Sequence, residues 1–263
     1  MVVVVLDRAD PGAERGRRGF PGRDVSHVGE ASGLETDATG NEEHMDDRTR
    51  TDAAAALRHD LVDRLVGAGT VSTDGVERAL REVPREAFVP GMDLVRVYED
   101  RAQLVKEDRG TPLSTISQPT MVAIMLELAA VEPGDRVLEI GTGTGYNAAL
   151  LGALVGPHGT VVTLDVEDDL VARARHVIDG LGLAHVEVHA ADGHLGWAAG
   201  APYDVVMSTA GIDVVPQHWR AQTADGGRLL VPGLRDHTLR VERRRGSAWA
   251  LEATSSAAFI PLR

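Results

Sequence analysis

Between residues 53 and 130, hydrophobic residues recur at helical spacing. Leu57, Leu61 and Leu65 share one face of a helix that we predict to begin at residue 53 and to end at the glycines at 67 and 69. A second helix should stop before Pro84, because the residue before a proline disfavours helical geometry. A third begins near Pro119, which suits a first helical turn. Residues 88–115, which contain prolines and glycines, are predicted to be a loop.

From residue 136 onward, short apolar runs alternate with helical stretches. The predicted strands are residues 136–140, 160–165, 186–190, 203–209 and 228–231. This alternation predicts βαβ units and a parallel sheet covered on both faces. Residues 239–245 and 248–260 contain no helical stretch between them and are predicted to form a hairpin. The expected fold is therefore α/β: a mostly parallel, doubly wound sheet with an antiparallel C-terminal hairpin and N-terminal helices.

The first 50 residues lack this patterning. After Val5 they are dense in glycine and charged residues with no helical or strand period, so they cannot bury enough surface to offset the entropy of ordering. We predict that residues 1–50 are a disordered extension. The remaining chain is long enough for one large domain with a full core.

Charge and cysteine content exclude several classes of function. The net charge of −13 argues against nonspecific binding to nucleic acid or to anionic lipid, and no apolar run approaches the roughly 20 residues that span a bilayer. The absence of cysteine excludes disulfides, thiolate metal ligands and a cysteine nucleophile. The histidines lack a metal-ligand spacing, so no metal site is predicted. We expect a cytoplasmic monomer.

The most informative motif is a strand that runs into Gly141-Thr142-Gly143-Thr144-Gly145 and then opens a helix. Glycines allow a sharp turn there and let a ligand approach the backbone. The alternative is a glycine turn that serves packing alone. Dinucleotide folds prefer Gly-x-Gly-x-x-Gly, whereas here the third glycine comes one residue early.

Acidic residues at the strand ends indicate which ligand this turn binds. Glu139 would repel a pyrophosphate but suit a cationic amino-acid group. Asp165 ends the second predicted strand, where an acid can accept hydrogen bonds from a ribose diol, and Asp192-Gly193 is placed to bind an adenine amino group. Together these residues predict a site for S-adenosylmethionine. An NAD-dependent oxidoreductase and a nucleotide-binding module without turnover are the rival interpretations.

Several further segments resemble one methyltransferase family. They are Arg85-Glu86-Ala87-Phe88-Val89-Pro90, Tyr98-Glu99-Asp100-Arg101, Thr115-Ile116-Ser117-Gln118-Pro119, the stretch from Val137 to Tyr146, and Gly226-Gly227-Arg228-Leu229-Leu230-Val231-Pro232. With them the chain resembles the protein-L-isoaspartate O-methyltransferases from about residue 53 to its end. The resemblance implies a class I Rossmann-like methyltransferase that esterifies the carboxylate of an L-isoaspartyl or D-aspartyl residue in a polypeptide, as in protein repair.

The resemblance also assigns residues to roles. Ser117 matches the active-site serine, which we expect to orient the substrate carboxylate, although it could instead only cap the following helix. Ile116 belongs to the cofactor lip, and Thr115, Gln118 and Pro119 to the substrate lip. The full set expected to bind the cofactor is Ile116, Glu139, Gly141, Thr142, Gly143, Gly145, Asp165, Asp192 and Gly193. Residues 51–130 would then form the helical and substrate-lip portion, and residues 131–263 the S-adenosylmethionine-binding core.

One segment departs from the repair enzymes. Where they generally carry a pair of alanines before a distal proline, this chain reads Thr209-Ala210-Gly211-Ile212-Asp213-Val214-Val215-Pro216. Together with Tyr98-Glu99-Asp100-Arg101 and Lys106-Glu107-Asp108, that segment looks more like an actinobacterial branch associated with ribosomal peptide tailoring. The alternative function is thus methylation of an aspartate that installs an aspartimide in a ribosomally synthesised peptide.

Overall fold

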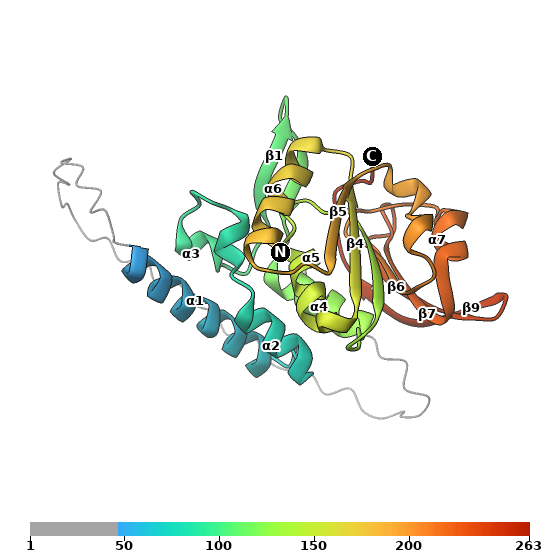
Figure 1. Cartoon of the computed structure of the whole chain (residues 1–263), viewed down its shortest axis with the longest axis horizontal. Coiled ribbons are helices and arrows are strands. Elements are labelled where there is room, and N and C mark those ends of the chain that lie inside the picture. Colours follow the sequence, from blue (N-terminus) through green and yellow to red (C-terminus); the bar gives the residue numbers. More distant parts are fainter. Residues whose placement is uncertain (1–46) are drawn as a thin grey trace, which may run out of the picture.

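The computed structural model describes residues 47–263 (Figure 1). The prediction of disorder for residues 1–46 therefore lies outside the described part, and for residues 47–50 it is wrong, because they are helical. The first helix, α1 (Asp47–Gly67), begins six residues before its predicted start. Among the described residues, no helix is both long and apolar enough to cross a membrane.

A seven-stranded sheet forms the centre of the molecule, in the order β5-β4-β3-β6-β7-β8-β9. Its strands are β3 (Arg136–Ile140), β4 (Thr160–Asp165), β5 (Val186–Ala190), β6 (Tyr203–Ser208), β7 (Thr223–Pro232), β8 (Thr238–Arg245) and β9 (Ala248–Ser256). The strands from β5 to β7 pair in parallel, and β8 and β9 pair antiparallel. This confirms the predicted mostly parallel sheet with an antiparallel C-terminal hairpin.

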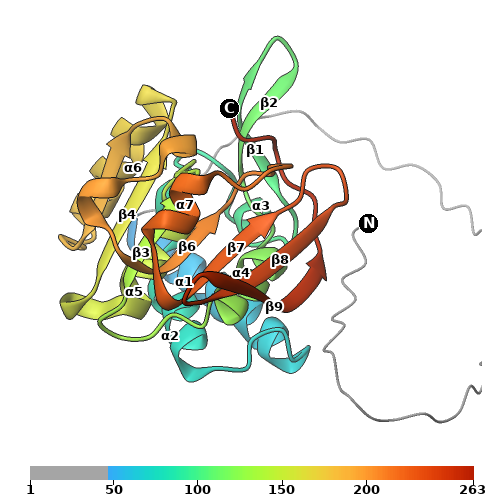
Figure 2. The same ribbon diagram turned by 90° about the vertical axis from the view of Figure 1, so that its right-hand side faces the viewer.

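Helices cover the two faces of the sheet unequally (Figures 1 and 2). One face carries the larger core, to which α1, α2 (Asp74–Glu82), α4 (Pro119–Ala129), α5 (Tyr146–Val155) and α6 (Asp168–Gly180) contribute. The other face carries a smaller core around Trp219 of α7 (Gln217–Gln222). Side chains alternate between these faces along β3: Val137 belongs to the larger core, whereas Leu138 and Ile140 belong to the smaller one.

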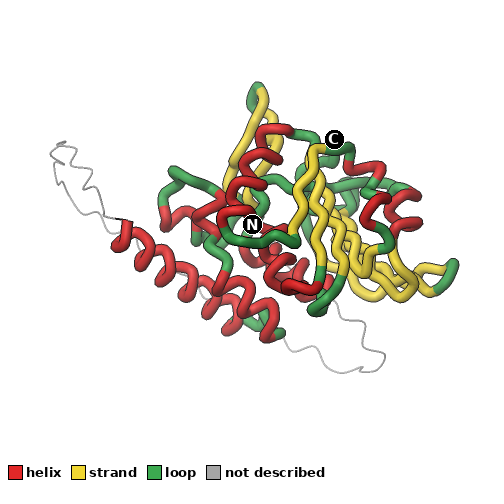
Figure 3. The backbone as a smooth tube through the Cα atoms, viewed as in Figure 1, coloured by secondary structure: helices red, strands yellow, loops and turns green. Residues whose placement is uncertain are grey.

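Residues 88–115 are not the single loop that we predicted. After the 3-10 turn Arg85–Phe88 they contain the short helix α3 (Leu94–Val97), the strand β1 (Gln103–Asp108) and most of β2 (Thr111–Ile116). The β1–β2 hairpin projects beyond the sheet (Figure 3). Arg109 and Gly110 link its strands with φ angles of 48° and 81°, as a tight hairpin turn requires. The strands are short and largely polar, so their sequence lacks a strand pattern.

The end of the chain also differs from its prediction. β9 ends at Ser256 instead of continuing to residue 260, because residues 257–263 leave the sheet edge. Gly211 donates a backbone hydrogen bond to Ile260 and accepts one from Leu262. These bonds bring the C-terminal segment back to one end of the sheet, beside the β1–β2 hairpin (Figure 2).

Candidate functional site

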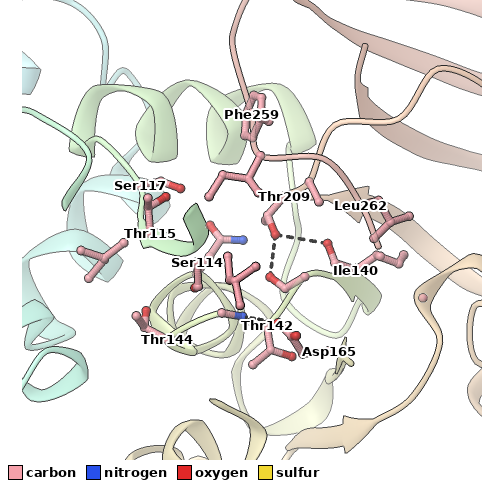
Figure 4. A pocket seen from close by; sticks show the side chains of 18 of the residues that line it. Ser114, Thr115, Ser117, Ile140, Thr142, Thr144, Asp165, Thr209, Phe259 and Leu262 are labelled. Carbon is pink, nitrogen blue, oxygen red and sulfur yellow. Dashed lines mark hydrogen bonds between the residues drawn. The ribbon is translucent and has the colours of Figure 1, made fainter. Parts of the chain in front are cut away.

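A cavity of about 400 Å³ lies at the carboxyl ends of β3, β4 and β6, next to β2 and the C-terminal segment (Figure 4). This is the end of a parallel sheet, beside the strand at which the order reverses, where α/β folds bind ligands. Its volume lies within the range of small-molecule sites. The predicted site residues that line it are Thr115, Ile116, Ser117, Gln118, Gly141, Thr142, Gly143, Asp165 and Gly193.

The glycine turn forms the base of this cavity. The backbone N–H groups of Gly141 and Thr142 donate to the Leu164 carbonyl at 2.8 and 3.0 Å, which holds the turn against β4. Gly141 has a φ of 101°, and a Cβ there would collide with the hydroxyl of Thr209. Thr209 donates to the Gly141 carbonyl at 2.5 Å. The turn is thus fixed by bonds from two neighbouring strand ends.

Gly145 does not line the cavity, although we grouped it with the cofactor-binding glycines. A Cβ at Gly145 would lie 2.8 Å from the Ala174 Cβ of α6, and its φ is 89°. Gly145 therefore allows the start of α5 to pack closely on α6.

Replacing Gly145 with alanine should accordingly destabilise the fold. Steric overlap and the left-handed backbone together predict a loss of about 2 kcal/mol in the free energy of unfolding. Urea denaturation measures this loss. Gly180→Ala is the matched control, because a Cβ there meets nothing within 4 Å and should be neutral or slightly stabilising. Equal stability of the two variants would contradict the packing role.

Asp165 joins the glycine turn to the end of β4. Its Oδ2 accepts from the Gly143 N–H at 2.8 Å, and its Oδ1 accepts from the Glu167 N–H at 3.1 Å. Each carboxylate oxygen retains room for a further hydrogen bond. Asp165 is half-buried on the cavity wall and can therefore serve a ligand as an acceptor.

The structure places Glu139 behind the cavity wall. Its side chain is 0% exposed, and its oxygens accept from Asn147 Nδ2 at 2.7 Å and Thr163 Oγ1 at 2.5 Å. Burial raises the pKa of Glu139 to about 7, although both hydrogen bonds oppose the rise. The Thr163 hydroxyl lies 2.8 Å from that of Thr142. Because Asn147 and Thr142 line the cavity, Glu139 reaches it through these neighbours.

Asp192 and Gly193 occupy different positions. The Asp192 carboxylate is exposed and accepts from both the backbone N–H and the ring Nδ1 of His194, at 2.9 Å each. These bonds lower the pKa of Asp192, and its side chain is not on the cavity wall. Gly193 does line the cavity, where a Cβ would collide with Ile140. The structure thus brings Gly193, but not Asp192, to the other predicted residues.

The lip residues lie along one side of the cavity, where β2 leads into α4 (Figure 4). Ile116 is 2% exposed and ends β2, whereas Pro119 is buried in the first turn of α4 and lies outside the lining. The N-cap of α4 is Gln118, so the capping alternative for Ser117 is not supported. Within the described residues, the hydroxyl of Ser117 has no hydrogen-bond partner. That hydroxyl remains available to a ligand.

Sequence reasoning missed the wall formed by the C-terminal segment. Phe259, Leu262 and Arg263 line the cavity, and Figure 4 shows Phe259 on the side away from Thr142 of the glycine turn. Glu167 binds Arg263 at 2.9 Å and also pairs with Lys106 of the hairpin. Because these contacts join segments about 60 and 100 residues from Glu167, no local sequence signal could reveal them.

The charges on the wall distinguish between ligands. Among the described residues, Asp165 and Arg263 are the charged side chains that line the cavity. Arg263 is engaged by Glu167, so a pyrophosphate at the turn would meet the Asp165 carboxylate without a free cation beside it. A ribose diol would instead find an acceptor there. No cluster of histidine and acidic side chains suited to a metal occurs in residues 47–263.

Comparisons with known proteins agree with this geometry. The family described as Protein-L-isoaspartate(D-aspartate) O-methyltransferase (PCMT) matches residues 56–263. Protein-L-isoaspartate O-methyltransferase 2 of Shewanella sediminis is 35% identical over 208 residues, which cover 78% of this chain and 82% of that protein. The protein-L-isoaspartate O-methyltransferase of Methanothermobacter thermautotrophicus is 36% identical over 209 residues, covering 78% of this chain and 94% of the relative.

Solved structures are similar over the same part of the chain. A protein-L-isoaspartate O-methyltransferase structure superimposes with a TM-score of 0.72 at 33% identity, covering 78% of this chain and 65% of that one. A putative protein-L-isoaspartate O-methyltransferase from Plasmodium falciparum, in complex with S-adenosyl-L-homocysteine, gives a TM-score of 0.66 at 19% identity. It covers 78% of this chain and 98% of its own, and its low identity supports the fold alone.

Proposed function

Since the chain belongs to the protein-L-isoaspartate(D-aspartate) O-methyltransferase family, we propose that it methylates the free carboxylate of L-isoaspartyl or D-aspartyl residues in polypeptides. The observation that carries this proposal is that one cavity brings together the unbonded Ser117 hydroxyl and the Asp165–glycine turn. The names of the relatives support this repair-type activity over aspartimide installation in a dedicated peptide.

The residues on the cavity wall fit S-adenosylmethionine, which would supply the methyl group as a sulfonium. Gly141, Thr142 and Gly143 form a turn that lines the cavity, and the Asp165 carboxylate suits a ribose diol. Ile116 and Gly193 complete the contact surface that we propose for the cofactor. Glu139 would act on it through Asn147, not directly.

The work of this chain is to position two reactants and to exclude water. A substrate carboxylate is already ionised near neutrality, so the transfer requires no strong base. Ser117 would donate a hydrogen bond to that carboxylate, while the neighbouring Thr115 and Gln118 contact the peptide around it. Ile116 and the C-terminal wall limit access of water to the reacting atoms. Alignment of this kind can supply effective molarities of roughly 10⁵ to 10⁸ M.

The proposed activity has a direct test. Purified protein should transfer a labelled methyl group from S-adenosylmethionine to a peptide that contains one isoaspartyl residue. A peptide of the same sequence with a normal aspartyl residue is the control and should remain unlabelled. Labelling of the aspartyl peptide alone would favour the aspartimide alternative, and labelling of neither would refute carboxyl methylation of these peptides.

Replacing Ser117 with alanine should lower kcat while leaving the affinity for the cofactor nearly unchanged. Loss of one hydrogen bond to a charged carboxylate predicts a decrease of roughly tenfold or more. Ser72→Ala is the matched control. The Ser72 hydroxyl donates a hydrogen bond of 2.9 Å to Glu127, and neither residue lines the cavity. Steady-state kinetics and calorimetry separate the two effects. A normal kcat in the Ser117 variant would remove its proposed role.

We also propose that the protein acts as a cytoplasmic monomer on polypeptides and binds neither nucleic acid nor membranes. The net charge of −13 supports the part of this proposal that concerns nucleic acid and membranes, because phosphates and anionic lipid would be repelled.

A further inference from the structure

Arg85 is a buried cation directly beneath the lip. It opens the 3-10 turn Arg85–Phe88, and its side chain is 0% exposed. Its Nε donates to the Val97 carbonyl at 2.9 Å, and its Nη2 donates to the Ser117 carbonyl at 2.8 Å. The guanidinium therefore joins the end of α3 to the backbone of the residue that we place against the substrate.

No carboxylate among the described residues forms an ion pair with Arg85. Its guanidinium lies 5.0 Å from the centre of the Tyr146 ring, and its Nη1 is buried with no hydrogen-bond partner in the described chain. Burial lowers the pKa of Arg85. An unpaired buried charge is unfavourable for stability compared with an apolar side chain of similar size. Its contacts therefore point to a role in geometry.

The surroundings of Arg85 supply that role. Tyr146 opens α5 directly after the glycine turn and lines the cavity, so the guanidinium touches both the cofactor side and the lip. On the exposed side of the lip, Asp100 accepts from the Thr120 N–H at 2.8 Å and from Gln118 Nε2 at 3.2 Å. Arg85 thus holds the backbone of Ser117 from the buried side of the lip, while Asp100 holds Gln118 and Thr120 from its exposed side.

We propose that Arg85 is a positioning residue for methyl transfer, which fixes the backbone of Ser117 so that its hydroxyl meets the substrate carboxylate. The proposal rests on the proposed function of Ser117. The planar guanidinium donates from two nitrogens to carbonyls on different segments, those of Val97 and Ser117. The single nitrogen of a lysine ammonium does not reproduce this geometry. Arg85 touches neither reactant and acts through Ser117.

The test compares Arg85→Lys and Arg85→Met with the matched control Arg175→Met. In the wild-type protein the guanidinium of Arg175 also donates to a backbone carbonyl, that of Val188, at 2.6 Å. Melting temperatures are recorded first, and kinetics are measured well below the lowest of them. Arg85→Lys should lower kcat about tenfold for an isoaspartyl peptide, with the Kd for S-adenosylhomocysteine changed less than threefold. Arg175→Met should retain its kcat.

A double-mutant cycle with Ser117→Ala separates positioning from general loss of structure. If Arg85 acts through Ser117, Arg85→Lys should lower kcat little further once the serine hydroxyl is gone. Additive losses, or an unchanged kcat in Arg85→Lys, would overturn the inference while the wild-type activity stands. Absence of methyl transfer by the wild-type protein would instead overturn the proposed function and this inference with it.

Discussion

Asp165→Asn is expected to weaken the binding of S-adenosylmethionine by roughly 10-fold to 150-fold, equivalent to losing one hydrogen bond to a charged group at 1.5 to 3 kcal/mol. Asparagine can still accept from the Gly143 N–H, which Asp165 binds at 2.8 Å, so the turn should persist. What disappears is the charged acceptor that faces the cavity beside the turn. Calorimetric titration with the cofactor or its demethylated product measures the loss directly.

Asp168→Asn provides the control for that experiment. Asp168 also carries a carboxylate in the β4–α6 region, but it is exposed at the start of α6 and does not line the cavity. Its replacement should leave the affinity within about twofold of wild type, because exposed charges interact weakly. Equal losses in both variants would indicate a general effect of negative charge, and no loss in either would remove Asp165 from the binding site.

The sheet was predictable because its signal is local. Each buried parallel strand is a short apolar run between helical stretches, and strands β3 to β6 lie within one residue of their predicted bounds. The β1–β2 hairpin was not predictable in this way, since Lys106, Glu107 and Asp108 favour no strand. What supports this hairpin is tertiary: Lys106 pairs with Glu167 and Asp169 at the start of α6.

The site was predictable only at the level of its main-chain motifs. The glycine turn and Asp165 converge because the carboxyl ends of parallel strands meet at one edge, whereas the lip reaches the same cavity from the end of β2 in the separate β1–β2 hairpin. Glu139 does not join them on the wall, because it lies one residue before Ile140 and alternation turns its side chain toward α5. Asp192 turns back onto His194, a local bond that competes with any ligand contact.

The burial of Glu139 makes the stability of the ligand-free protein depend on pH. The pKa of this carboxyl is about 7 in the folded protein against an ordinary value of 4.5, so the folded state holds the proton more tightly. The contribution of Glu139 to the free energy of unfolding is therefore fully present below pH 4.5 and is lost as the pH rises toward and through 7. The total loss is about 3 kcal/mol by pH 8.

Glu139→Gln should abolish this loss, because a neutral amide keeps an acceptor for Asn147 Nδ2 and does not ionise. The difference in free energy of unfolding between the variant and wild type is thus expected to rise by about 3 kcal/mol between pH 4.5 and pH 8. The other ionisable side chains are the same in both proteins, so their contributions cancel in the difference. Thr163→Val is the matched probe: it removes the 2.5 Å donor that opposes the pKa rise, so its destabilisation should be larger at pH 8 than at pH 5. Urea denaturation between pH 4.5 and pH 8 measures these free energies of unfolding. If those of the wild type and of Glu139→Gln changed with pH in parallel, the assignment of a buried, titrating Glu139 would be contradicted.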